Sequence, residues 1–124
     1  MRGMPRWREV CLALGMLVML ERISPAELKQ RLDRCEDLVL LDVREPEEMA
    51  RAGLPGALRI PLGEIPGRIQ DLDPEKEIVV FCHYGLRSAQ VAIFLAQRDF
   101  EHVLNLTGGI NAWSLTVDPT VPRY

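Results

Sequence analysis

The chain has 124 residues, of which 48% are hydrophobic and 27% are charged, and this balance predicts one compact domain with its own core. The formal net charge of -3 disfavours a broad nucleic-acid surface, because such surfaces pair many Lys and Arg residues with phosphates. We therefore expect no nucleic-acid partner. Three cysteines without a C-x-x-C pair favour neither a disulfide scaffold nor a zinc site, so we expect a protein of the reducing cytoplasm with no metal and no cofactor.

Residues 1–20 form an apolar N-terminal extension that we separate from the predicted domain. Arg2, Arg6 and Arg8 precede the apolar stretch 10–20, which resembles a signal peptide but lacks a small-x-small cleavage site. The stretch is also shorter than the roughly 20 residues that a membrane-spanning helix needs. We expect either an extra helix packed on the domain or a loosely ordered extension. An interfacial membrane anchor is a third alternative, which the length disfavours.

The first predicted helix runs from Pro25 to Arg34. Ser24 and Glu27 have the spacing of a capping box, and Pro25 stands at the first helical position, where its missing N–H costs nothing. The apolar run 38–41 leads into Asp42-Val43-Arg44, a pattern typical of a strand buried on both faces of a parallel sheet. An acidic segment at 47–51 then predicts a short helix.

The remaining elements continue this alternation of strands and helices. We expect a brief strand at 58–60, a helical segment within 61–70, a strand at 78–81, a helix at 89–98 capped by Ser88, a strand at 103–106 and a short helix that holds Trp113. Alternation of this kind predicts an α/β domain with a mostly parallel sheet. The predicted domain covers 21–116, and the tail 117–124 is expected to run over the surface.

The loop after the strand at 78–81 carries the candidate chemistry. Cys82 stands at the carboxyl end of that strand and before a helix, where open parallel sheets bind ligands. Backbone N–H groups at such a place favour an anion, so we expect Cys82 to be a thiolate-biased nucleophile. Gly85 allows a tight backbone, and Arg87 offers a positive charge to steer or hold an anionic donor. The alternative is that Cys82 is an inert buried cysteine, which its position disfavours.

Three segments resemble conserved segments of the rhodanese family. The loop Cys82-His83-Tyr84-Gly85-Leu86-Arg87-Ser88 resembles the rhodanese active-site loop. Leu41-Asp42-Val43-Arg44 through Glu48 resembles the first family signature, and Thr107-Gly108-Gly109-Ile110 with Ala112-Trp113 resembles the C-terminal one. The resemblance implies a three-layer α/β fold with a five-stranded, mostly parallel sheet flanked by helices.

The resemblance also implies sulfur transfer in two displacements. The Cys82 thiolate attacks the outer sulfur of a small anionic donor such as thiosulfate and expels sulfite. Cyanide or a thiol, including a protein thiol, then collects the sulfur from the Cys82 persulfide. The substrate-binding residues implied are His83, Tyr84, Gly85, Leu86, Arg87 and Ser88.

Two alternatives to a thiosulfate sulfurtransferase remain open. A sulfur-relay or docking module would take sulfur from a partner protein and barely use free thiosulfate; the short chain and the apolar N-terminus favour this reading. A small cysteine phosphatase is disfavoured, because Cys82 and Arg87 have C-x4-R spacing whereas the related dual-specificity phosphatases have C-x5-R.

The other singled-out residues are interpreted as structural. Asp42, Arg44 and Glu48 are expected to tie neighbouring loops together, Asp42 and Arg44 through an ion pair. His83, with an ordinary pKa near 6.5, is expected to be mostly neutral at pH 7 and to act first as a backbone donor in the loop. Trp113 is expected in the core. Cys35 stands at a helix end where glycine would be comfortable.

Overall fold

The computed structural model describes residues 20–124 of the chain. The predictions for the N-terminal extension therefore lie outside the described residues, apart from Leu20. Leu20 is half-buried and packs against the core on one face of the sheet. Among the described residues, no helix has both the length and the apolar composition needed to cross a membrane.

Five strands form one parallel sheet in the order β1-β5-β4-β2-β3. This confirms the predicted α/β fold with a five-stranded sheet and makes the sheet parallel throughout. The strand β1, which the sequence did not predict, has two residues, too few for a hydrophobic period to show. The bounds are β1 (Arg22–Ile23), β2 (Val39–Asp42), β3 (Leu58–Arg59), β4 (Ile78–Phe81) and β5 (Val103–Leu106).

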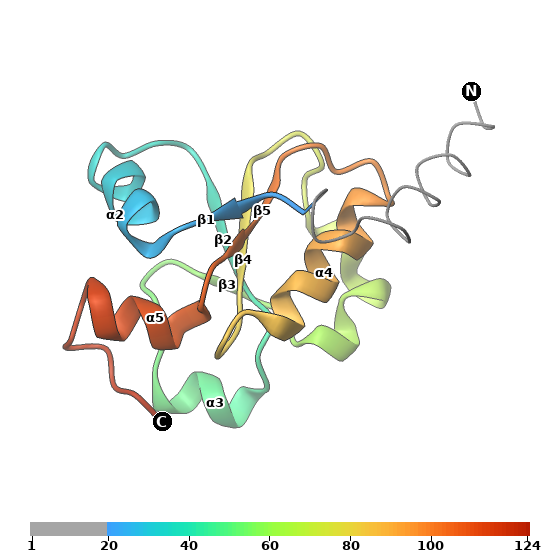
Figure 1. Cartoon of the computed structure of the whole chain (residues 1–124). Helices are drawn as coiled ribbons and strands as arrows, with labels where there is room; N and C mark the ends of the chain where they lie inside the picture. The colour runs from blue at the N-terminus through green and yellow to red at the C-terminus, as the bar shows by residue number, and fades with distance from the viewer. Residues whose placement is uncertain (1–19) are drawn as a thin grey trace.

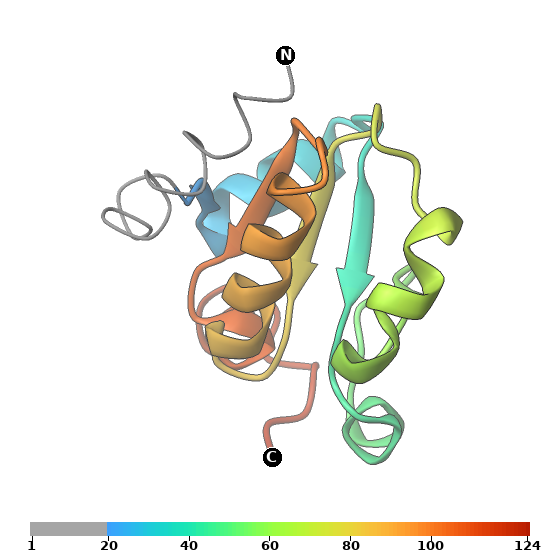
Figure 2. The same cartoon turned by 90° about the vertical axis from the view of Figure 1, so that its right-hand side faces the viewer.

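Helices cover both faces of the sheet (Figure 1; Figure 2). Alternate side chains of β4 enter two separate apolar clusters, because successive residues of a strand point to opposite faces. One cluster lies under α4 (Leu86–Ala96) and the 3-10 helices η1 (Leu62–Glu64) and η2 (Pro66–Asp71). The other lies under α2 (Pro25–Asp33) and α5 (Gly109–Thr116), and includes Trp113 as expected.

The helix ends follow local chemistry. Ser24 and Glu27 form the predicted capping box, in which the Glu27 N–H donates to Ser24 Oγ at 3.1 Å and the Ser24 N–H donates to Glu27 Oε1 at 3.2 Å. Cys35 follows α2 with φ of 57°, the left-handed region that favours glycine. The segment 61–70 gives the two 3-10 helices instead of one helix, because Pro66 has no N–H to donate.

One prediction about the second half of the chain is wrong. The helix α4 begins at Leu86 and not at Ala89, so Ser88 is not its N-cap; Gly85 holds that position with φ of 102°. The tail after α5 has four exposed residues, at 119, 120, 122 and 123, and two anchors: Val121 is buried, and the Tyr124 hydroxyl hydrogen-bonds Arg44 and Glu48. The helix α3 (Pro46–Arg51), which carries Glu48, lies near this tail (Figure 1).

Candidate active site

Cys82 lies directly after the central strand β4, at the carboxyl end of the sheet, and is 1% exposed. The chain turns at Gly85 and enters α4, so the sulfur faces the first turn of that helix. A Cβ atom at Gly85 would lie 3.3 Å from the Gly108 nitrogen and 3.4 Å from the Leu106 oxygen. Both the positive φ and this close approach require glycine here, which agrees with the tight backbone expected from the sequence.

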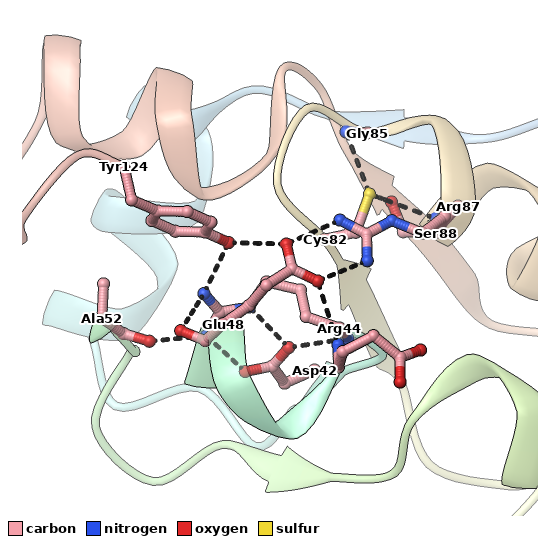
Figure 3. Close-up of polar contacts among 10 residues, drawn as sticks. Asp42, Arg44, Glu48, Ala52, Cys82, Gly85, Arg87, Ser88 and Tyr124 are labelled. Atoms are coloured by element: carbon pink, nitrogen blue, oxygen red, sulfur yellow. Dashed lines mark hydrogen bonds and ion pairs between the residues drawn. The ribbon is translucent and has the colours of Figure 1, made fainter. Parts of the chain in front are cut away.

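Three polar groups contact the Cys82 sulfur (Figure 3). The Gly85 N–H donates to Sγ at 3.1 Å, the Ser88 N–H donates at 3.3 Å, and the Ser88 hydroxyl lies at 3.3 Å. N–H groups that point at one atom stabilise negative charge on it, the more so at a buried site where water competes little. The loop is therefore built to hold an anionic sulfur.

Asn105 on β5 completes this network and was missed by the sequence reasoning. The Ser88 hydroxyl donates to Asn105 Oδ1 at 2.6 Å, and Asn105 Nδ2 donates to the Gly85 carbonyl at 3.1 Å. A buried polar side chain inside an otherwise apolar strand was the signal that could have found it. Asn105 thus ties the turn at Gly85 and the helix residue Ser88 to the sheet.

The first turn of α5 holds the loop from its other side. The Ile110 N–H donates to the Cys82 carbonyl at 2.9 Å, and the Asn111 N–H donates to the His83 carbonyl at 3.0 Å. Gly109 makes this approach possible, because a Cβ there would lie 2.5 Å from each of those two carbonyl oxygens. The C-terminal signature therefore fixes the position of the candidate nucleophile.

Arg87, which was expected to offer a positive charge to an anionic donor, lies in an ion pair with Glu48. Its guanidinium donates to both carboxylate oxygens of Glu48, at 2.6 and 2.9 Å. The same carboxylate accepts hydrogen bonds from the Glu45 N–H at 3.0 Å and the Tyr124 hydroxyl at 3.0 Å. Mainly because of the Arg87 hydrogen bonds, the pKa of Glu48 falls from 4.5 to about 2, and the pKa of Arg87 rises. Both groups are charged at neutral pH and neutralise each other.

Asp42 and Arg44 form an ion pair with no solvent exposure. Arg44 donates to Asp42 at 2.9 and 2.7 Å, to the Ala52 carbonyl at 2.6 Å and to the Tyr124 hydroxyl at 2.9 Å. These contacts join the end of β2, the end of α3 and the C-terminal tail. The geometry of the pair is therefore that of a structural link between loops.

His83 stacks between two tyrosines. Its ring centroid lies 3.9 Å from that of Tyr84 and 4.0 Å from that of Tyr124. Burial lowers the pKa of His83 below 6.5, so the imidazole is neutral at pH 7. The backbone of His83, expected to donate in the loop, contributes its carbonyl as an acceptor; the amide donors to the sulfur are those of Gly85 and Ser88.

The rim of the loop is exposed and apolar. Tyr84 is 58% exposed and Leu86 is 78% exposed, although both lie within four residues of the buried Cys82. Within residues 20–124, no group of three or more His, Cys, Asp or Glu side chains is placed to hold a metal ion.

Together, fold and site define a small α/β protein that presents a cysteine in an anion-binding backbone loop. The family model for the rhodanese-like domain matches residues 24–116, so the chain belongs to the rhodanese-like sulfurtransferase family.

Two relatives and one solved structure illustrate this membership. A sulfurtransferase of Allochromatium vinosum is 40% identical over 96 residues, which cover 77% of this chain and 90% of that protein. The thiosulfate sulfurtransferase GlpE of Pseudoalteromonas translucida is 28% identical over 103 residues, which cover 83% of this chain and 97% of that protein. The crystal structure of a rhodanese-related protein from Thermoplasma volcanium superposes with a TM-score of 0.73 at 29% identity, covering 84% of this chain and 99% of that one.

Proposed function

We propose that this chain carries a sulfane sulfur on Cys82, taking it from a donor such as thiosulfate and passing it to a thiophilic acceptor such as cyanide or a thiol. The observation that carries the proposal is the pair of amide N–H groups, from Gly85 and Ser88, directed at the Cys82 sulfur. Family membership supports sulfur transfer as the reaction class.

The reaction consists of two displacements at sulfur. In the first, the Cys82 thiolate attacks the outer sulfur of thiosulfate; the new S–S bond forms as the old one breaks, and sulfite leaves with the bonding electron pair. In the second, the acceptor attacks the outer sulfur of the Cys82 persulfide and restores the thiolate. Because the charge stays on sulfur throughout, the same N–H groups stabilise the enzyme before and after transfer.

A sulfur relay fed by a partner is the second candidate function. The exposed residues Tyr84 and Leu86 favour it. Apolar groups around a reactive sulfur suit contact with the apolar surface of a partner better than contact with a free inorganic anion. The relative named for thiosulfate supports the first candidate. Steady-state turnover with thiosulfate and cyanide separates the two: a saturable, rapid rate supports the enzyme, and a negligible rate supports the relay.

We place this chemistry in the reducing cytoplasm. Among the described residues, Cys35 and Cys82 are free cysteines, and a free thiol that must cycle between thiolate and persulfide is preserved best where other thiols are kept reduced.

Intact-mass spectrometry after incubation with a donor tests the proposal. Wild-type protein should gain one sulfur, about 32 mass units. Cys82→Ala should gain none, whereas the exposed-cysteine control Cys35→Ala should gain as much as wild type. Sulfur uptake by Cys82→Ala would contradict the assignment, and hydrolysis of an aryl phosphate that depends on Cys82 would support the phosphatase reading instead.

A further inference from the structure

Within residues 20–124, three side chains near the Cys82 loop could supply positive charge to an anionic donor, and the charge of each is either compensated or absent. Arg87 is held by both oxygens of Glu48. Arg44 is buried and paired with Asp42. His83 is neutral at pH 7. A donor approaching Cys82 therefore meets backbone N–H groups and exposed apolar side chains next to a salt bridge with no net charge.

The Arg87–Glu48 pair lies within electrostatic reach of the sulfur. A thiolate at Cys82 contributes to raising the pKa of Arg87, so the two groups interact. Figure 3 shows the Arg87 guanidinium turned to Glu48, with both pairs of donor and acceptor atoms joined. Glu48 is itself held in place by the Glu45 N–H and the Tyr124 hydroxyl. The contacts between α3, α4 and the C-terminal tail therefore hold Glu48 where it compensates the charge of Arg87.

We propose that Glu48 determines donor specificity: by neutralising Arg87 it disfavours doubly charged donors at Cys82 and selects an organic persulfide, R–S–SH. This inference rests on the proposed function of Cys82. Thiosulfate carries two negative charges and its leaving group sulfite is also anionic, so a nearby uncompensated cation would favour both. A persulfide carries one charge at most, and its R group can pack against Tyr84 and Leu86, which are both exposed.

The transfer from a persulfide balances without an added reagent. The Cys82 thiolate attacks the outer sulfur of R–S–SH, the bond between the two donor sulfurs breaks, and the electron pair leaves on the thiolate R–S⁻. The transferred sulfur keeps its proton, so the products are the protonated Cys82 persulfide and the donor thiolate R–S⁻. One negative charge is present before and after the step, so the neutral salt bridge need not compensate a change in charge.

The test compares rates of sulfur uptake at Cys82 from thiosulfate and from 2-hydroxyethyl persulfide generated in solution. Wild type should react faster with the persulfide. In Glu48→Gln, which frees Arg87 while keeping an oxygen for the Glu45 N–H, the ratio of the thiosulfate rate to the persulfide rate should rise about tenfold or more. A protein persulfide as the donor in a parallel reaction distinguishes a protein source of R–S–SH from a small-molecule source.

Two control variants isolate the charge effect. Glu47→Gln removes one negative charge from the same helix at an exposed position and should leave the ratio near that of wild type. In the double variant Glu48→Gln/Arg87→Gln the freed cation is gone, so the gain in the ratio should disappear.

The dependence of the wild-type rate on ionic strength tests the inference even if a variant fails to fold. With Arg87 neutralised, the thiosulfate rate should depend only weakly on ionic strength, because no net charge steers the anion. A steep fall of that rate with salt, a faster wild-type reaction with thiosulfate, or an unchanged ratio in folded Glu48→Gln would each overturn the inference. Absence of sulfur uptake from both donors would instead contradict the proposed function.

Discussion

At the scale of single residues, the site depends on a serine shared between a reactive sulfur and a buried amide. The Ser88 hydroxyl lies 3.3 Å from Cys82 Sγ and donates to Asn105 Oδ1 at 2.6 Å. Its one hydrogen is used by Asn105, so its oxygen faces the sulfur as an acceptor while that hydrogen bond holds. This serine therefore links the reactive sulfur to the sheet through a side chain and a main-chain N–H.

Ser88→Ala should cost about 1–3 kcal/mol of unfolding free energy, because Asn105 Oδ1 would be left buried without a donor. The rate of sulfur uptake at Cys82 should also fall, since the turn at Gly85 loses part of its link to α4. Urea unfolding and intact-mass time courses measure the two effects. Ser24→Ala, which removes a distant helix cap worth about 1 kcal/mol, should lower stability without slowing uptake.

At the scale of secondary-structure elements, the active-site loop is held by the starts of two helices. The N-cap Gly85 and the α4 residue Ser88 supply the two amide donors to the sulfur. The first turn of α5 supplies the donors to the carbonyls of Cys82 and His83. Gly109, the first residue of α5, faces the loop with φ of 64° and no room for a side chain.

Gly109→Ala should destabilise the fold by more than about 2 kcal/mol and slow sulfur uptake about a hundredfold, because the added Cβ would push against two carbonyl oxygens of the loop. Thermal unfolding and intact-mass kinetics check both parts. Gly63→Ala is the matched control: its Cβ would meet nothing within 4 Å, so both quantities should change little. Equal behaviour of the two variants would contradict the packing account.

The contact between α3 and α4 predicts a dependence of stability on pH. The pKa of Glu48 in the folded protein is about 2, below its ordinary value of 4.5, so the Arg87 pair stabilises the fold fully above pH 4.5 and loses that contribution as pH falls towards 2. The difference in unfolding free energy between wild type and Glu48→Gln should therefore shrink over this window. Urea unfolding between about pH 5 and pH 2.5 measures it, and subtraction of the two proteins removes the contribution of Glu77, whose pKa Arg31 also lowers.

The sequence predicted these elements where the local signals agreed. The strands at 78–81 and 103–106 and the capped helix after Ser24 match the structure, because apolar runs and capping boxes are local patterns. The start of α4 was misplaced because serine is a common N-cap, whereas the left-handed Gly85 that takes this role is decided by the close approach of Gly108. The ion pair between Arg87 and Glu48 could not be predicted from the sequence either, because the two residues are 39 positions apart and only the fold brings them together.

At the scale of the whole molecule, the C-terminal tail packs against residues that surround the active-site loop. Val121 is buried under α5, where Ser114 donates to its carbonyl at 2.6 Å. Tyr124 then places its ring against His83 and its hydroxyl between Arg44 and Glu48. One residue thereby connects the buried Asp42–Arg44 pair with the Glu48–Arg87 pair, and we propose that the functional unit includes this tail.

Tyr124→Phe keeps the ring stacked on His83 but removes both hydroxyl hydrogen bonds, so it should cost about 1–2 kcal/mol. Tyr84→Phe removes the hydroxyl of an exposed ring on the other side of His83 and should change stability by less than about 0.5 kcal/mol. Urea unfolding of both variants measures the difference. A Tyr124→Phe protein as stable as Tyr84→Phe would mean that the tail hydroxyl contributes nothing to the link between the two ion pairs.

The most direct test of the account is to locate the transferred sulfur by peptide mass spectrometry after treatment of the wild-type chain with a sulfane sulfur donor. The account predicts one added sulfur, about 32 mass units, on the peptide that contains Cys82, removed again by cyanide or a thiol. A chain that gains no sulfur there, or gains it on Cys35 or Cys11 while Cys82 stays unmodified, would contradict it.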